Sequence, residues 1–289
     1  MKHPRVFAVA IAGVVCGIAL IAIAHSLPGA GASPPGTTPG ALENRHPPGG
    51  FLSFARTPRR AGNLLVRRGV VGSSGGVAGH SATNRPIALL QRGDSAIDGE
   101  VLVFGCIHGD ECAARGLQPL SNGCPDPASD IYLVPNLNPD GFALGTRLNG
   151  RGVDLNRNFP SGWKQIGRRG DPQYSGPRPF SEPETRLAAR IVGRLRPEVT
   201  IWFHQHRAPR PLVRAWGQSV AAARRYAALA RLPFRRLPWP AGTAPNWQNH
   251  RFPGTASFVV EMPRGPLPER LESRLERSIV LLAREVGED

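Results

Sequence analysis

Lysine is nearly absent from this sequence of 289 residues: it occurs only at Lys2 and Lys164, although Lys and Arg together number 36 against 21 acidic residues. Arginine therefore carries almost all of the formal net charge of +15. A charge of this sign fits an anionic partner such as a cell-wall polymer, a membrane or a nucleic acid. The arginines are scattered and form no basic stripe with aromatics. We therefore attribute the charge to a general enrichment in Arg, Ala, Gly and Pro, and we expect no nucleic-acid binding.

Cysteine is also scarce, and the sequence has no paired Cys-x-x-Cys spacing of the kind that binds zinc through cysteine. An internal repeat at the period of a solenoid or propeller is absent as well. Cys106, Cys112 and Cys124 lie beyond the N-terminal region, so one disulfide and one free thiol is the simplest arrangement. We favour a Cys106–Cys112 bond, and a Cys112–Cys124 bond is the alternative.

The N-terminal region predicts export. Lys2 and Arg5 precede an uncharged apolar run at residues 6–24 that ends in a small-x-small pattern, as a secretory signal does. The run is long enough to span a bilayer, so an uncleaved membrane anchor at residues 1–24 is the alternative. Residues 25–62 are rich in Pro and Gly and read as a linker. We expect the rest to reach the cell envelope or the exterior, an oxidising compartment that permits disulfides.

From residue 63 onward, short apolar runs alternate with helical patterns. We expect strands at residues 85–93, 100–106, 130–138, 199–206 and 255–262, and helices at residues 110–120, 182–195, 219–232 and 269–286. Runs such as "VLVFG" lack the polar alternation of a one-sided sheet. The pattern predicts an α/β fold, a three-layer αβα sandwich over a twisted, largely parallel mixed sheet, in one domain at residues 63–289. Ser181 and Glu184 predict a capping box for the helix at 182–195.

Candidate ligands stand at the ends of three of these strands. His108 follows one strand almost directly, and His204 and Glu261 close two others. In such sheets, sites collect at the carboxyl ends of strands. His108 and Glu111 are spaced to grip one cation from the first turn after a strand, although an isolated His-x-x-Glu is usually structural. With His204 added, two histidines and one glutamate leave open the fourth position of a catalytic zinc site.

On these motifs the chain resembles the zinc carboxypeptidase family over most of its length after the linker. The matching segments are "HGDE", "WFHQ", "SFVVEMP" and the long "NPDGFALGTRLNGRGVDLNRNFP" at residues 138–160. The last of these, together with "FHQ", is most similar to the branch of bacterial murein peptide amidases.

The resemblance implies one zinc ion per chain, with His108, Glu111 and His204 as its protein ligands. It implies that Glu261 is the base that activates a zinc-bound water and then returns the proton to the leaving amine. A carboxylate beside such a water can both accept and deliver that proton.

The same resemblance implies roles for four residues of the long motif. Arg147 would stabilise the oxyanion, and Asn156 and Arg157 would hold the carboxylate of the leaving residue, which suits a planar guanidinium. Asp154 would orient the first ligand histidine through its other ring nitrogen. His206 is placed with the substrate-binding residues, because a strand directs positions two apart to the same face.

The chain departs from the digestive carboxypeptidases at one point. Those enzymes carry a mobile tyrosine over the site, and the stretch at residues 235–254 contains no tyrosine. The same stretch should line the pocket for the departing side chain, but "GTAPNW" spells no familiar specificity.

These residues predict an exported zinc metallopeptidase, a hydrolase that cleaves an amide bond next to a carboxylate-bearing terminal residue. The nearest branch implies the γ-D-glutamyl–diaminopimelate bond of peptidoglycan-derived peptides as substrate, and we expect a monomer. One alternative is a general metallocarboxypeptidase. Another is an aspartoacylase-like deacylase, although the "NPDG" segment argues against it. An inactive wall-binding protein of the same fold would be expected to have lost a ligand or Glu261, and neither is lost.

Overall fold

The computed structural model describes residues 74–93, 100–117, 130–206 and 210–287, all of which belong to one structural unit. The predicted signal or anchor at residues 1–24, the linker at residues 25–62 and the domain boundary at residue 63 lie outside these ranges. Among the described residues, no helix is both long enough and apolar enough to cross a bilayer.

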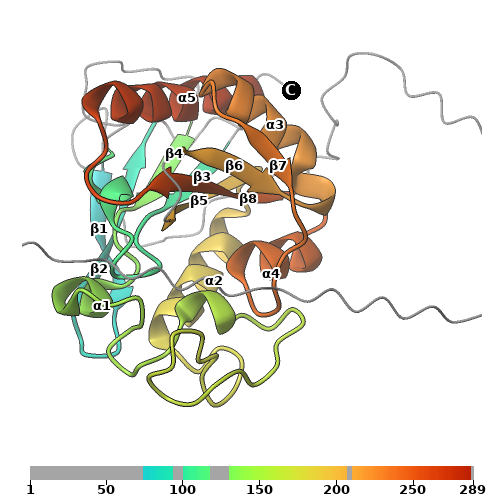
Figure 1. Cartoon of the computed structure of the whole chain (residues 1–289). Coiled ribbons are helices and arrows are strands. Elements are labelled where there is room, and N and C mark those ends of the chain that lie inside the picture. Colours follow the sequence, from blue (N-terminus) through green and yellow to red (C-terminus); the bar gives the residue numbers. More distant parts are fainter. Residues whose placement is uncertain (1–73, 94–99, 118–129, 207–209, 288–289) are drawn as a thin grey trace, which may run out of the picture. The chain divides into compact units, whose positions relative to one another are not determined.

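A mixed sheet of eight strands forms the centre of the described residues (Figure 1). Its order is β1-β2-β4-β3-β5-β8-β6-β7, and the strands are parallel except at β1–β2, β2–β4 and β8–β6. The bounds are β1 Ser74–His80, β2 Pro86–Arg92, β3 Glu100–Phe104, β4 Asp130–Val134, β5 Val199–His206, β6 Leu212–Ala215, β7 Phe234–Arg236 and β8 Ala256–Pro263.

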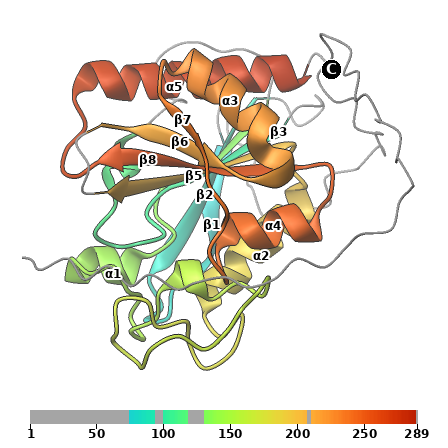
Figure 2. The same ribbon diagram turned by 45° about the vertical axis from the view of Figure 1, so that its right-hand side comes forward.

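Helices cover both faces of this sheet, α3 and α5 on one side and α2 and α4 on the other (Figures 1 and 2). Their bounds, with those of α1 in the loop after β4, are α1 Pro139–Leu144, α2 Pro183–Leu195, α3 Val220–Leu229, α4 Ala244–Arg251 and α5 Glu269–Gly287. The arrangement confirms the predicted three-layer α/β sandwich.

The strand sequences explain why both faces are covered. Val101 and Val103 of β3 pack with α3 and α5, whereas Leu102 and Phe104 of the same strand pack with α2 and α4. Successive side chains of a strand point to opposite faces, so an apolar residue at every position needs a helix layer on each side. Phe104 also stacks on Trp202 of the neighbouring β5, with ring centroids 4.1 Å apart.

The helix predicted at residues 110–120 is wrong. The structure has only a 3₁₀ helix, η1, at Ala113–Gly116, and residues 118–129 lie outside the described ranges. The backbone N–H of Ala113 donates to the side chain of Gln205 on β5 instead of to the carbonyl four residues earlier. Arg115 then donates to the carbonyl of Cys112, which is the 3₁₀ spacing. A contact with another strand therefore prevents the α-helix from starting.

The predicted capping box at α2 is wrong as well. Glu182 is the N-cap residue and makes no side-chain cap. The hydroxyl of Ser181 donates to the carboxylate of Glu182, and the buried Glu184 accepts from the backbone N–H of Ala82, 2.8 Å away. Glu184 is used to fix the turn between β1 and β2, so it is not available to cap its own helix.

Candidate metal centre and active-site cleft

Three parallel strands bring the candidate site together at their carboxyl ends. β3 leads into the loop of His108 and Glu111, β5 carries His204, and β8 carries Glu261. His204 and Glu261 are direct partners in the register of β5 and β8. The strand-end positions predicted from the sequence therefore do meet, as expected where parallel strands end at one edge.

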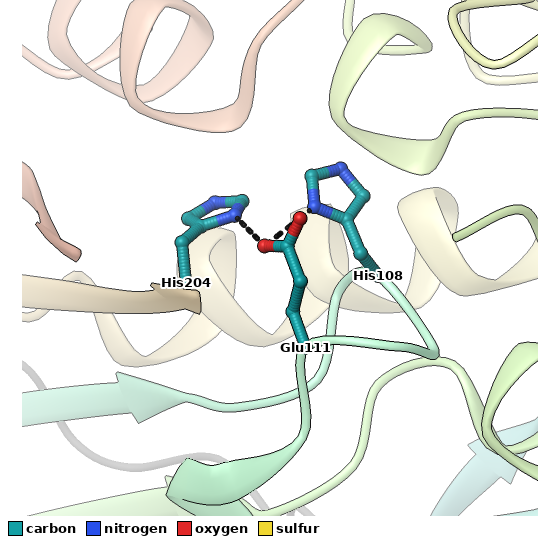
Figure 3. A group of neighbouring side chains, drawn as sticks. All are labelled: His108, Glu111 and His204. Carbon is teal, nitrogen blue, oxygen red and sulfur yellow. Dashed lines mark hydrogen bonds and ion pairs between the residues drawn. The ribbon is translucent and has the colours of Figure 1, made fainter. Parts of the chain in front are cut away.

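The side chains of His108, Glu111 and His204 converge on one point (Figure 3). Nδ1 of His108 lies 3.0 Å and Nδ1 of His204 lies 2.9 Å from Oε2 of Glu111, and the three candidate donor atoms lie within 4.8 Å of one another. Nδ1 of His108 is buried, and its geometry toward Glu111 leaves it without a hydrogen-bond partner. Two imidazole nitrogens and one carboxylate oxygen form a donor set that suits zinc.

The electrostatics of this group also favour a bound cation. Burial by itself would lower the pKa of His108, but the carboxylates of Glu111 and Asp154 outweigh it and raise that pKa to about 9. Burial would raise the pKa of Glu111, yet His108 and His204 hold it well below its usual range. Because a histidine binds a metal ion through an unprotonated ring nitrogen, metal binding would displace a proton from His108.

A buried carboxylate fixes the orientation of the first histidine. Oδ1 of Asp154 lies 3.1 Å from Nε2 of His108, which leaves Nδ1 as the ring nitrogen that faces Glu111. Such a partner sets both the tautomer and the ring plane of a ligand histidine. The position of Asp154 is therefore the one that the resemblance implies.

Arg147 ties this carboxylate to the candidate ligand. Its Nη1 lies 2.9 Å from Oε1 of Glu111, and its Nε and Nη2 lie 3.0 and 2.9 Å from Oδ2 of Asp154. The guanidinium lines the cleft beside the candidate metal position, and two carboxylates hold it in place.

Asn156 lies closer to the candidate metal centre than the sequence reasoning anticipated. Its Nδ2 lies 3.3 Å from Nε2 of His204, and its Oδ1 accepts from the backbone N–H of Ala244 at 2.9 Å. The amide therefore holds the second histidine and joins it to the start of α4. Arg157 donates from Nη1 to the carbonyl of Asn156, and the remainder of its guanidinium lines the cleft.

The loop that carries His108 and Glu111 is closed by a disulfide between Cys106 and Cys112. The favoured pairing is confirmed and the Cys112–Cys124 alternative is wrong, while Cys124 itself lies outside the described ranges. The glycine of "HGDE" is also explained, because a Cβ at Gly109 would lie 2.0 Å from the backbone of Gly141 in α1. The loop is held by a covalent bond and by close backbone packing.

We expect the double variant Cys106→Ala/Cys112→Ala to bind the metal more weakly. The disulfide limits the conformations of the loop before the metal binds. Losing this preorganisation should cost about 1.4 kcal/mol of binding free energy, which raises the dissociation constant for zinc by about tenfold. Competition titration against a chromogenic chelator measures the affinity, with circular dichroism as the check on folding. The control is Cys124→Ser, which leaves the Cys106–Cys112 bond intact. An affinity unchanged in the double variant would show that the disulfide does not organise the site.

The candidate metal centre lies in a cleft of about 420 Å³, which His108, Glu111 and His204 line. Glu261 lines it with its side chain 17 % exposed, together with Arg147, Asn156 and Arg157. The side chain of His206, which was placed here from the sequence, lies outside the described part of the chain. The cleft therefore brings together every other predicted site residue except Asp154, which lies buried behind His108.

The sequence reasoning missed several residues of this cleft: Gln205, Arg214, Trp239, Thr243 and Arg264. Trp239 and Thr243 belong to the tyrosine-free stretch that was expected to line the pocket. Arg214 carried one usable signal, because it is a lone charge within the short apolar run of β6.

Comparisons with known proteins show which families the chain is similar to. The profile of the zinc carboxypeptidase family matches residues 128–233. Murein peptide amidase A of Escherichia coli strain K12 is 34% identical over 126 residues, which are 36% of this chain and 48% of that protein. Carboxypeptidase B of Astacus astacus is 31% identical over 137 residues, 37% of this chain and 45% of that protein. The chain thus spans about half the length of the curated relatives it matches.

Solved structures extend the similarity beyond the matched segment. The murein-tripeptide amidase of Escherichia coli O157 superposes with a TM-score of 0.59 at 25% identity, over 73% of this chain and 91% of that one. Carboxypeptidase A of Helicoverpa armigera gives a TM-score of 0.62 at 17% identity, over 75% and 68% of the two chains, and shows a likeness of fold. His108, Glu111 and Glu261 lie outside the profile match, so the fold is what brings them to the site.

Proposed function

Because the chain belongs to the zinc carboxypeptidase family, we propose that it is a zinc-dependent hydrolase that releases a carboxy-terminal residue from a peptide. The observation that carries the proposal is the convergence of His108, Glu111 and His204 on one point, in a cleft that also holds Glu261 and Arg157. One zinc ion would be held by Nδ1 of His108, Nδ1 of His204 and the carboxylate of Glu111. When bound there, it would act as a Lewis acid on the scissile carbonyl and make a nearby water more acidic.

Glu261 acts as general base and general acid. It pairs in register with His204, two residues before the end of β8, and its side chain lines the cleft together with the candidate metal ligands. In that position it takes a proton from the attacking water and delivers it to the leaving nitrogen. No tyrosine lies in the stretch where the digestive enzymes carry theirs, so the second transfer also rests on Glu261.

Arg147 and Arg157 each interact with a different negatively charged group of the substrate. Arg147 is fixed by Glu111 and Asp154 and stabilises the developing oxyanion, which requires donors that are already in place. Arg157 binds the free carboxylate of the leaving residue. The contact of Asn156 with His204 favours a positioning role for its amide, in place of the shared carboxylate clamp predicted from the sequence.

The substrate that we propose is a murein-derived peptide, cleaved at its γ-D-glutamyl–diaminopimelate bond. The names of the relatives support this choice, since a murein peptide amidase and a murein-tripeptide amidase are among them. General carboxypeptidase activity is the second candidate, favoured by the similarity to a carboxypeptidase B.

We expect amidation of the substrate's carboxy terminus to remove most of the activity. Amidation removes the negative charge that Arg157 binds, and the loss of a charge-assisted hydrogen bond lowers kcat/KM by about 100-fold. The measurement compares L-Ala-γ-D-Glu-diaminopimelate with the analogue amidated at the carboxyl beside the scissile amide, by chromatography of the products. Equal hydrolysis of both would contradict the carboxylate clamp and indicate an endopeptidase.

We also propose that the protein is exported. The disulfide between Cys106 and Cys112 supports an oxidising compartment, as does the apolar segment at residues 6–24. Cell fractionation with immunodetection tests this, and recovery of the protein in the cytosolic fraction alone would contradict it.

A further inference from the structure

The cleft contains an arginine that the proposed reaction does not use. Arg214 of β6 pairs in register with Val259 of β8, and Glu261 follows two residues later on the same face of β8. Since β8 lies between β5 and β6, Arg214 is on the side of Glu261 that faces away from His204. Arg214 therefore lies beyond the catalytic glutamate, as seen from the metal ligands.

The contacts of Arg214 with the described residues leave its guanidinium able to bind a further partner. Its Nη1 lies 3.5 Å from Oε1 of Glu261, the outer limit of a hydrogen bond, and its Nε is buried without a hydrogen-bond partner. The guanidinium carbon lies 5.5 Å from the centre of the Trp239 ring, which supports the side chain from one side. The side chain is 24 % exposed and lines the cleft.

The excess of positively charged side chains around the cleft also favours an anionic substrate. The charged side chains that line it are Arg147, Arg157, Arg214, Arg264, Asp110, Glu111 and Glu261. Four arginines thus face three carboxylates, before the charge of a metal ion is added. The pKa of Arg157 is lowered, first by burial and further by nearby cations that include Arg214, against the opposing effect of Asp154. Arg157 and Arg214 both line the cleft, so a ligand with two carboxylates could pair with both guanidinium groups.

The proposed reaction fixes where the leaving residue lies. Its nitrogen is next to Glu261 and its main-chain carboxylate is at Arg157. The cleft residues that remain for its side chain include Val259, Trp239 and Arg214. The first two offer apolar surface to a methylene chain, and Arg214 offers a positive charge at its end.

We infer that Arg214 selects substrates whose leaving residue carries a second carboxylate on its side chain. The inference rests on the proposed function and goes beyond it by assigning the specificity to one side chain. Diaminopimelate and glutamate carry such a group. Lysine and norleucine offer a similar carbon chain without it.

The test compares kcat/KM of the zinc-loaded full chain on L-Ala-γ-D-Glu-X, with X as diaminopimelate, glutamate, lysine or norleucine. The wild type should favour the first two over the last two by about 100-fold, since a charge-assisted hydrogen bond is present only in the first two. Arg214→Met keeps the aliphatic stem against Trp239 but removes the charge, and should reduce that preference to below about fivefold.

Arg236→Met is the matched control, since it removes a guanidinium that also packs on a tryptophan, Trp216, at 5.1 Å from the ring centre, but Arg236 is not among the residues that line the cleft. It should leave the substrate preference as in the wild type. If Arg214→Met slows all four substrates by the same factor, Arg214 supports Glu261 and the selectivity inference is wrong. Equal wild-type turnover of the four would overturn the inference while upholding the proposed function.

A binding measurement separates the inference from the catalytic proposal. Calorimetry of the zinc-loaded wild type with the free amino acids should show tighter binding of diaminopimelate than of lysine, by about tenfold or more. The difference should disappear in Arg214→Met. Absence of hydrolysis together with this binding pattern would overturn the proposed function alone, and equal binding of the two amino acids would overturn the inference.

Discussion

Glu261→Gln is expected to lower kcat by about three to four orders of magnitude, the upper part of the about 10²–10⁴-fold that a positioned general base contributes. Glutamine keeps the shape and the hydrogen-bonding reach of the side chain but cannot accept the proton of the attacking water. The variant should fold, retain one zinc ion per chain and bind substrate with little change in affinity. Stopped assays with L-Ala-γ-D-Glu-diaminopimelate measure turnover, and elemental analysis of the same samples measures the metal.

Glu269→Gln on the exposed first turn of α5 is the control for Glu261→Gln, and it should retain wild-type turnover. A Glu261→Gln protein with a tenth or more of wild-type turnover would mean that another group is the base. Asp110, which lines the same cleft, and His206 would then be examined first.

His108→Ala is expected to abolish stoichiometric zinc binding and, with it, the activity. The substitution removes one of the three donors and leaves Asp154 buried without its histidine partner. The number of zinc ions per chain should fall from one to near zero after dialysis against metal-free buffer. Because His108→Ala also perturbs a buried pair, His204→Ala provides a second test of the same site, and both should lose the metal.

Two further histidine variants serve as controls for metal binding. His250→Ala, at an exposed position of α4, should retain the metal, and so should His206→Ala. If His206→Ala alone loses the ion, the third ligand has been assigned to the wrong histidine. Full occupancy in both His108→Ala and His204→Ala would contradict the metal centre itself.

The sequence allowed the central strands and the candidate ligands to be predicted, for a physical reason. The strands β3, β5 and β8 are nearly continuous apolar runs, which is the pattern of strands buried on both faces. His108, His204 and Glu261 stand where those runs end, so their meeting at one edge follows from parallel pairing alone.

The features that could not be predicted depend on contacts between segments far apart in the chain. The helix after Glu111 fails because Gln205 takes the N–H of Ala113, a bond across 92 positions of sequence. The contact of Asn156 with His204 spans 48 positions. Arg214 belongs to a strand of four residues, too short for a periodic signal, and it reaches the cleft only because β6 pairs with β8.

The most direct test of the account is a zinc titration of hydrolysis. The metal-free protein receives zero to two equivalents of zinc, and the release of free diaminopimelate from L-Ala-γ-D-Glu-diaminopimelate is followed at each point. We predict no release without zinc, a linear rise to one equivalent of zinc per chain and a plateau beyond it. Release by the metal-free protein that a chelator does not suppress, or no release at full occupancy of the site, would contradict it.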